Sequence, residues 1–515
     1  MIFLIAKKDF LLNLISVRFV IGFLLCLVII PFTVVVSVDN YLSRVQVYKI
    51  EKEKAEQEYK EIRVWSMLRP TVVKEPAVLS IFSNGISDNV GNTSQIKLGE
   101  YPLFPTGHVI TRDNPFLNAF FTIDFSKVIA ILISLIALVF SFDAITRERE
   151  DGTMKLTLTG QAGRITFLFG KLTGLLLTLL PILLFGYIIA CLIVLVNPGI
   201  TISATDWGGI LLLFLTSIVY MLVFILAGML ISSLVSRSSS SIIISLLCWI
   251  WFLFLLPNIS TYLSQSFVKV PLYDNVQSAM SEINKDIPKD YREARELINK
   301  TINVKNFSYW NHRSGGDGQF EMSGVTKELA LFHRELNKWI TPYLMDKADK
   351  KWAIQKNYLD ELVRQQQCQQ MIAWLSPSEI FGQSTNALCR TDMNSFLKFM
   401  ESVRNYRETF FRYYADKKLF ESVAYFTGHS IESLYSEEEI ERMGEDNYFE
   451  MMKAQNVNFS MFPYLNTDDV PRYVSQPTTL AASLSGAMGR LTALLALMVA
   501  LLIGTIAAFL KYDVR

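Results

Sequence analysis

A run of charged residues of both signs lies at positions 147–151, between two strongly apolar stretches of the chain. Five charges in a row cannot lie in hydrocarbon, so this segment must form a loop at one face of a membrane. Charges of both signs suit a polar groove on a soluble partner, whereas positive charge alone would be enough to set the topology of a loop. The candidate contact residues are Arg147, Glu148, Arg149, Glu150, Gly152 and Thr153.

Gly152 follows this charged run directly. A glycine can adopt the left-handed geometry that ends a short helix, and Thr153 then continues the chain toward the next apolar stretch. The loop is short and is held close to the membrane by apolar stretches on both sides. The sequence therefore predicts a short helix that can receive force from a soluble protein. The simpler alternative is that the two arginines only fix the topology, with the two glutamates balancing their charge.

Residue patterns for catalysis, nucleotide binding or metal binding are absent from the sequence. The nearest match to a phosphate-binding loop is residues 163–172, but six residues separate its glycines, and Leu172 replaces the Ser or Thr that would hold magnesium. No metal motif or nucleophile elbow is present. The four histidines are scattered, at His108, His312, His333 and His429. We therefore expect this chain to bind no cofactor and to be no enzyme.

Two of the five cysteines, Cys368 and Cys389, lie in polar sequence, whereas the other three lie in apolar stretches. They are 21 residues apart, and Pro377 between them permits a hairpin of two helices. In an oxidising compartment they are the available pair for a disulfide. Two buried free thiols are an equally good interpretation, because the sequence does not give the geometry that a disulfide needs.

The composition indicates a membrane protein with additional aqueous parts. Of 515 residues, 51% are hydrophobic and 19% are charged, and the apolar residues gather in runs long enough to cross a bilayer. The net charge of +1 gives no reason to expect a nucleic-acid partner. We expect membrane lipid to surround the apolar spans.

The predicted fold class is an α-helical polytopic membrane protein with six transmembrane helices. We expect the spans at residues 19–38, 125–142, 169–196, 207–235, 240–257 and 486–510. An amphipathic helix at residues 1–18, with Lys7, Lys8 and Asp9 opposite its apolar side, is expected to lie in the membrane interface. The remaining segments are a loop at residues 143–168, an extracytoplasmic segment at 39–124 and a large, mainly helical extracytoplasmic domain at 258–485.

The short loops give the orientation. Lys and Arg are frequent in residues 143–171 and near both chain ends, whereas the short loop at 197–206 has none. The positive-inside rule therefore predicts cytoplasmic N- and C-termini and a cytoplasmic 143–168 loop, in the cell (inner) membrane. Within the next span, Gly170 and Gly174 form a small-residue pair that lets a helix approach closely, and internal packing is the expected use.

The charged loop resembles the first cytoplasmic loop of type-2 ABC transporter permeases, in which an E-R-E-x-G-T-like pattern forms a coupling helix. The matching residues are Glu148, Arg149, Glu150, Gly152 and Thr153. A second match is Arg164, then Gly170 and Lys171 entering the next span, with Pro181 inside it. The large extracytoplasmic domain departs from the minimal pattern of that family.

This resemblance implies the membrane-spanning permease subunit of an ATP-driven exporter with an unknown substrate. A separate cytoplasmic ABC ATPase subunit would bind ATP and Mg, and a second permease copy or a related permease would complete the path. One alternative is a non-transporting membrane scaffold or sensor whose extracytoplasmic domain binds a partner. Another is a membrane enzyme acting on lipid or cell-wall material, although the sequence displays no polar site for it.

Overall fold

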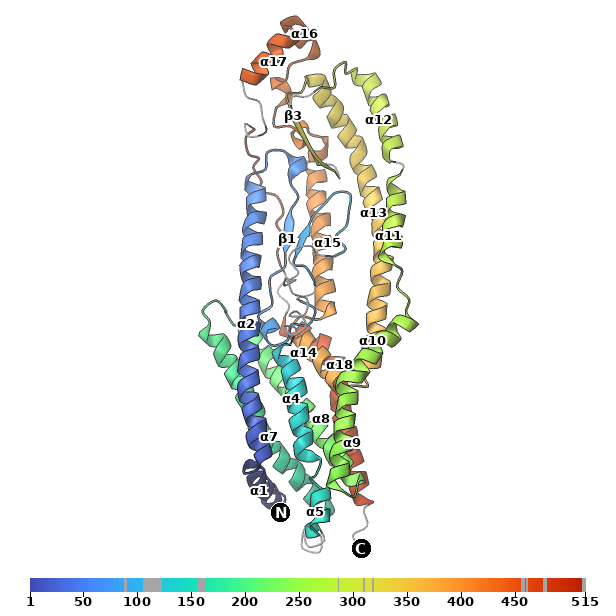
Figure 1. The fold of residues 1–515 in the computed structure, drawn as a ribbon. Helices are drawn as coiled ribbons and strands as arrows, with labels where there is room; N and C mark the ends of the chain where they lie inside the picture. The colour runs from blue at the N-terminus through green and yellow to red at the C-terminus, as the bar shows by residue number, and fades with distance from the viewer. Residues whose placement is uncertain are drawn as a thin grey trace.

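The molecule is elongated in this computed structural model, with a helical bundle at one end and a distal domain at the other (Figure 1). The structure describes residues 1–87, 90–104, 123–154, 163–285, 287–308, 311–316, 319–454, 459, 462–475 and 479–511. The first helix, α1 (Ile2–Leu14), and the short helix α5 (Thr146–Glu150) both lie at the free end of the bundle, far from the distal domain.

Six helices in the described part of the chain are long and apolar enough to cross a membrane. They are α2 (Val17–Lys60), α4 (Phe125–Ser141), α7 (Arg164–Val196), α8 (Ala204–Leu234), α9 (Ser238–Ile250) with its continuation, and α18 (Leu480–Leu510). The predicted fold class, an α-helical polytopic membrane protein, is confirmed.

Helix α2 runs without a break from the bundle into the distal domain (Figure 1). Ser16 caps its start by accepting a hydrogen bond from the Phe19 amide, and Pro31 is tolerated inside it. No glycine or proline follows Pro31 before the helix ends, so nothing interrupts it. Its 44 residues span roughly 66 Å, about twice the thickness of the hydrocarbon core. The charged stretch after residue 50 therefore continues the first span as one rod.

The fifth span also continues past its expected end at Pro257. A π-helical segment, η3 (Trp251–Leu255), joins α9 to α10 (Leu256–Phe267), which has Pro257 in its first turn. Proline lacks an amide hydrogen and clashes with the preceding turn, and a local π-helical segment is a usual way to relieve both within a helix. The rod then carries the chain out of the bundle toward the distal domain (Figure 1).

One short helix from the distal half of the sequence packs in the bundle. Helix α14 (Pro377–Leu388) has Pro377 in its first turn, where the missing amide hydrogen of proline costs no hydrogen bond, and contacts α4, α8 and α18. Phe381 stacks on Tyr220 of α8, with 4.4 Å between ring centroids. Ser376, which caps α14, also donates a hydrogen bond to the carbonyl of Phe252 in η3. The boundary between bundle and distal domain is therefore interlocked and not a flexible linker.

The distal domain has its own hydrophobic core and is mainly helical. Its core joins two apolar faces, around Phe332 and Leu336 and around Phe396 and Val403, whose residues recur at three- and four-residue steps in the sequence. The two faces belong to α13 (Lys327–Ala373) and α15 (Met393–Asp416). The other helices of this domain among the described residues are η1 (Trp65–Met67), α11 (Tyr273–Asn284), α12 (Ile287–Ile302), η4 (Leu419–Glu421), η5 (Val423–Tyr425), η6 (Ile431–Ser433), α16 (Glu437–Met443) and α17 (Glu445–Ala454). The short helix η2 (Val78–Ile81) instead packs Leu79 and Ile81 into the core of the bundle.

Two antiparallel two-stranded sheets lie in the described part of the distal domain. Strand β1 (Thr71–Val73) pairs with β2 (Thr93–Gln95), and β3 (Asn311–Gly316) pairs with β4 (Gln319–Ser323). The residue pairs are Thr71 with Gln95 in the first sheet and Asn311 with Ser323 in the second. Each sheet is short, so the core of α13 and α15 positions it rather than the reverse.

Candidate functional site

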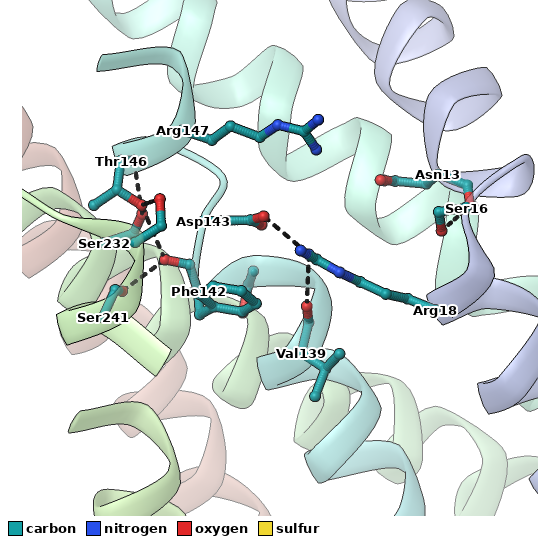
Figure 2. A network of polar contacts seen from close by, with 12 residues as sticks. Asn13, Ser16, Arg18, Val139, Phe142, Asp143, Thr146, Arg147, Ser232 and Ser241 are labelled. Atoms are coloured by element: carbon teal, nitrogen blue, oxygen red, sulfur yellow. Dashed lines mark hydrogen bonds and ion pairs between the residues drawn. The ribbon is translucent and has the colours of Figure 1, made fainter. Parts of the chain in front are cut away.

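Helix α5 follows α4 after a tight turn and carries the charged run that the sequence singles out (Figure 1). Its first residue, Thr146, is buried and faces the end of α8. The amide nitrogens of Ile145 and Thr146 donate hydrogen bonds to Ser232 Oγ at 3.1 and 3.0 Å, and Ser241 Oγ donates to the carbonyl of Phe142 (Figure 2). These bonds fix the turn between α4 and α5 against α8 and α9.

An arginine at the start of α2 holds the other side of this turn. Arg18 forms an ion pair with Asp143, with 2.9 Å between Nη1 and Oδ2, and the same nitrogen donates to the carbonyl of Val139 (Figure 2). Its guanidinium also lies 5.0 Å from the centroid of the Phe142 ring. Because the last turn of a helix leaves carbonyl groups without partners, a cation is favourable there. The contact joins the first and second spans beside α5.

Lys171, near the start of α7, is the centre of a buried ion network. Its Nζ lies 2.8 Å from Glu148 Oε1 and 3.1 Å from Asp9 Oδ2, and Lys8 lies 3.6 Å from the same glutamate oxygen. The side chains of Lys171, Asp9 and Glu148 are only 9%, 11% and 13% exposed. Burial raises the pKa of the Asp9 carboxyl, and the neighbouring Lys171 opposes that rise. The network connects α1, α5 and α7.

The glycine pair in α7 lets α1 approach closely enough for this network to form. A Cβ atom on Gly170 would lie 2.8 Å from side-chain atoms of Ile5, and one on Gly174 would lie 3.0 Å from the Asp9 Cβ. The first distance is shorter than real Cβ contacts, so a side chain at Gly170 would displace α1, whereas at Gly174 the contact would be tight and Asp9 would have to shift slightly. The pair therefore serves internal packing, as predicted. Lys7 and Lys8 are exposed as expected, but Asp9 on the predicted polar side is buried.

Half-buried Arg149 and exposed Glu150 bind the turn between α8 and α9. Glu150 accepts hydrogen bonds from the Ser238 amide at 2.9 Å and from Ser238 Oγ at 2.7 Å, so it satisfies the start of α9. Arg149 Nη1 donates to the carbonyl of Val235 at 3.0 Å. Val235 and Ser238, which flank the turn between α8 and α9, are therefore both bonded to α5.

The exposed side of α5 carries a different set of residues. Arg147 and Asp151 form a loose ion pair, with 3.8 Å between Nε and Oδ2, and their side chains are 69% and 61% exposed. Gly152 has φ +70° and nothing within 4 Å of the position of a Cβ, so its backbone geometry favours glycine although the surrounding space does not demand it. Thr153 is exposed and its hydroxyl turns back to the Glu148 carboxylate. We call Arg147 of α5, together with Asp151 and Gly152 directly after the helix, the exposed face of α5.

The six residues singled out from the sequence thus divide into two groups. Glu148, Arg149 and Glu150 bind neighbouring elements of this chain, whereas Arg147 and Gly152 face solvent, and Thr153 does both. Sequence reasoning missed Asp9 and Lys171 as partners of Glu148. The sequence contains a partial signal, because a lysine entering an apolar span needs a counter-ion. Asp9 and Glu148 lie at the same membrane face, but so do Asp143, Glu150 and Asp151, and the sequence does not choose among them.

The two candidate disulfide cysteines are free thiols in the structure. Cys368 is half-buried on α13, whereas Cys389 is fully buried at the end of α14, in the core of the bundle. The structure does not join them. Among the described residues, no group of three or more His, Cys, Asp or Glu side chains is arranged to hold a metal ion.

Comparison with known families identifies this membrane bundle. A family model described as ABC-2 family transporter protein matches residues 3–514. The chain therefore belongs to the ABC-2 transporter family, which makes it a multi-pass membrane protein and a permease component of an ABC transporter. Permeases of this family in general lack ATP-binding motifs and work with an ATPase subunit. No curated protein matches the chain.

Proposed function

We propose that this chain is the permease subunit of an ATP-driven exporter and that α5 is the helix through which a separate cytoplasmic ATPase moves it. The exposed face of α5 is the observation that carries this proposal. It presents charges of both signs at the free end of the bundle, on a helix whose opposite side is fixed to neighbouring helices. A surface that serves only to fix topology would not need such attachments.

The attachments of α5 give a route for force. It is joined through the backbone to α4, through Arg149 and Glu150 to the turn between α8 and α9, and through Glu148 to Lys171 of α7. Lys171 in turn holds Asp9 of α1. A push on the exposed face of α5 therefore reaches five elements of the bundle at once. The proposed motion is a tilt of the spans that opens and closes a path, driven by ATP and Mg bound to the ATPase.

We further propose that two copies of this chain, or this chain and a related permease, enclose the path. The helices differ in how much of their apolar length is covered within one copy. Only 28%, 11% and 17% of the apolar windows of α2, of the rod from Ser238 to Phe267 and of α18 are buried, compared with 72% for α4. The uncovered sides are available to lipid and to a second bundle.

The orientation belongs to the same proposal. The free end of the bundle carries α1, α5 and their basic residues, and the positive-inside rule places such an end in the cytoplasm. The distal domain would then lie outside the cell membrane, at the exit of the path. Its own core and its interlocked boundary suit a domain that shapes the exit or receives the substrate from the bundle.

Affinity purification of the tagged full chain from native membranes tests this function. We expect an ATPase with a phosphate-binding loop to co-purify in a ratio of two permease chains to two ATPase chains, and its ATP hydrolysis to depend on the permease. Recovery of an intact permease with no ATPase, in a detergent that preserves other ABC complexes of the same membranes, would favour a non-transporting scaffold or sensor.

A further inference from the structure

The fifth span is longer than the bilayer that it crosses. The helical rod Ser238–Phe267 has 30 residues and is therefore roughly 45 Å long, whereas the hydrocarbon core is roughly 30 Å thick. Most of α10 therefore extends past the core on the side of the distal domain. The chain stays almost free of charge over this extension, since residues 238–273 contain a single charged residue, Lys269.

Helix α10 stays near the membrane because it bends away from the axis of the bundle. It leaves the direction of α9 and runs sideways before the chain turns toward α11 (Figure 1). Two hydrogen bonds from α13 hold it there: Gln369 Nε2 donates to Ser260 Oγ at 3.2 Å, and Gln365 Nε2 donates to the carbonyl of Val268 at 2.8 Å. The headgroup region extends roughly 5–8 Å beyond each side of the core, so α10 lies at the depth of the headgroups.

The polarity of α10 does not suit a helix on the surface of a soluble domain. It packs on α13, and two of its three buried residues are Ser260 and Ser264. Its exposed side includes Ile259 and Tyr262, which are 38% and 73% exposed. In water a helix buries its apolar residues and exposes its polar ones. Buried serines beside exposed apolar residues therefore indicate surroundings less polar than water.

The turn after α10 continues the same apolar surface. Phe267 and Leu272 are 70% and 71% exposed, and Tyr273 is also exposed. Large apolar residues gathered on an aqueous surface mark a contact site, and tyrosine is enriched where headgroups meet hydrocarbon. The one charge, Lys269, is a cation that can reach lipid phosphates while its apolar stem lies among these residues. We call Ile259, Tyr262, Phe267, Leu272 and Tyr273 the elbow surface.

The end of α13 shows the same features at the same level. It lies alongside the end of the fifth span, because Ser376, shortly after α13, donates a hydrogen bond to the carbonyl of Phe252. Residues 365–378 contain no charged residue, and Met371 and Leu375 are largely exposed. Two segments far apart in the sequence therefore both become uncharged, with exposed apolar side chains, where they pass this level. A bilayer surface imposes such a change on every segment that meets it.

We propose that the elbow surface lies in the headgroup layer of the bilayer, on the side of the distal domain, and anchors this domain to lipid. Its continuity with the fifth span and its lack of acidic residues favour a lipid surface over a protein partner. The anchor fixes the depth of α10 and of the α13 end that packs on it. This proposal rests on the membrane location of the bundle and is independent of the proposed coupling role of α5.

Photo-crosslinking of the full chain in its native membranes identifies what touches the elbow surface. The residue p-benzoylphenylalanine replaces Tyr262, Phe267 or Leu272, one at a time. The control position is Leu297, which is 68% exposed on α12, far from the bundle (Figure 1). After irradiation and purification, we expect phospholipid adducts at the three elbow positions at least tenfold more often than at position 297. Adducts mainly with a second copy of this chain or with another protein would overturn the proposal, as would lipid adducts no more frequent than at the control.

Hydrogen exchange tests whether the contact holds the elbow in place. The full chain is compared in nanodiscs of phosphatidylcholine and phosphatidylglycerol as wild type, as the double variant Phe267→Asp, Leu272→Asp, and as the control Leu297→Asp. The two replaced side chains are mostly exposed within the chain, so aspartate removes little internal packing but is unfavourable among lipid tails and headgroups. We expect the amides of residues 259–273 to exchange at least tenfold faster in the double variant and at the wild-type rate in the control. Equal exchange in all three proteins would show that lipid does not hold the elbow.

Discussion

Lys171 of α7 and Glu148 of α5 form an ion pair of 2.8 Å at the free end of the bundle, and Asp9 of α1 shares the same ammonium group. This pair makes α5 part of the bundle instead of a loose loop. It also explains the presence of Glu148, because a loop that only fixed the topology would not need this acidic residue. Breaking this ion pair should affect folding. A substitution of Glu148 therefore changes the stability of the bundle as well as any contact with a partner protein.

The network predicts an order of stability losses. Lys171→Met leaves two nearly buried carboxylates, Asp9 and Glu148, with only Lys8 at 3.6 Å, and should lower the free energy of unfolding by about 3 kcal/mol. Glu148→Gln leaves Lys171 paired with Asp9 and should cost about 1 kcal/mol. Denaturant unfolding of the purified chain measures both. Equal losses, or a larger loss for Glu148→Gln, would show that Lys171 is not the centre of the network.

The close approach of α1 to α7 predicts a steric effect at Gly170. An added Cβ would lie 2.8 Å from Ile5, so Gly170→Ala should displace α1 and lower the stability by about 1–3 kcal/mol. Gly489→Ala is the control, because that glycine lies in α18 with nothing within 4 Å of a Cβ, and alanine should be neutral or slightly stabilising there. The thermal unfolding temperatures of the two variants give the comparison. No loss in Gly170→Ala would mean that α1 packs elsewhere.

Gly152 should be sensitive to backbone conformation and not to size. Its φ of +70° is left-handed, and the surrounding space is open. Gly152→Ala should therefore cost about 1 kcal/mol and loosen the end of α5, whereas Gly152→Asn should cost less, because asparagine tolerates this conformation better. Hydrogen exchange of the α5 amides, compared between the two variants, measures the loosening. A larger effect for asparagine would contradict a conformational cause.

The distal domain should lose stability in acid through His333. Burial among aromatic rings, with Arg295 as a second cause, lowers the pKa of His333 to about 4, from 6.5. A lowered pKa means that the folded state favours neutral His333. The contribution of His333 to stability is therefore fully present above about pH 6.5, and it falls by about 1.4 kcal/mol per pH unit between there and about pH 4.

The variant His333→Leu isolates this effect. Other groups titrate equally in both proteins, so the difference in unfolding free energy between pH 7 and pH 5 should be about 2 kcal/mol smaller in the variant. Denaturant unfolding in detergent, followed by tryptophan fluorescence, gives the four values. An identical pH dependence in the two proteins would show that His333 is solvated in the folded state.

Much of the architecture could be predicted because the hydrophobic effect acts on runs of residues. The apolar runs give six spans, and the three- and four-residue spacing around Phe332 and Phe396 gives the core of the distal domain. The predicted end of the fifth span at Pro257 was wrong, because a π-helical segment lets the helix continue past this proline. The length of α2 was also missed, since Asp39 and Asn40 end the apolar run without ending the helix.

The candidate site could be located from the sequence but not divided into its two sides. The pattern of charges in residues 147–153 identifies the helix and its terminal glycine. Which charges face inward depends on partners far along the chain, such as Asp9, Lys171 and Ser238. Pairings over such distances are set by the packing of the bundle, and no local spacing encodes them.

Exchanging the two charges of the exposed face tests the coupling role of α5 most directly. The double variant Arg147→Asp, Asp151→Arg keeps the net charge of the loop and the ion pair along the helix, and it leaves Glu148, Arg149 and Glu150 in place. Lys52→Glu, an exposed change on the distal part of α2, is the control. The measurement is ATP hydrolysis by the co-purified ATPase, with and without each permease variant. The exchanged variant should insert and fold normally but bind or stimulate the ATPase at least tenfold less than wild type, while the control should behave as wild type. Full stimulation by the exchanged variant would contradict the assignment and leave α5 as a topological signal.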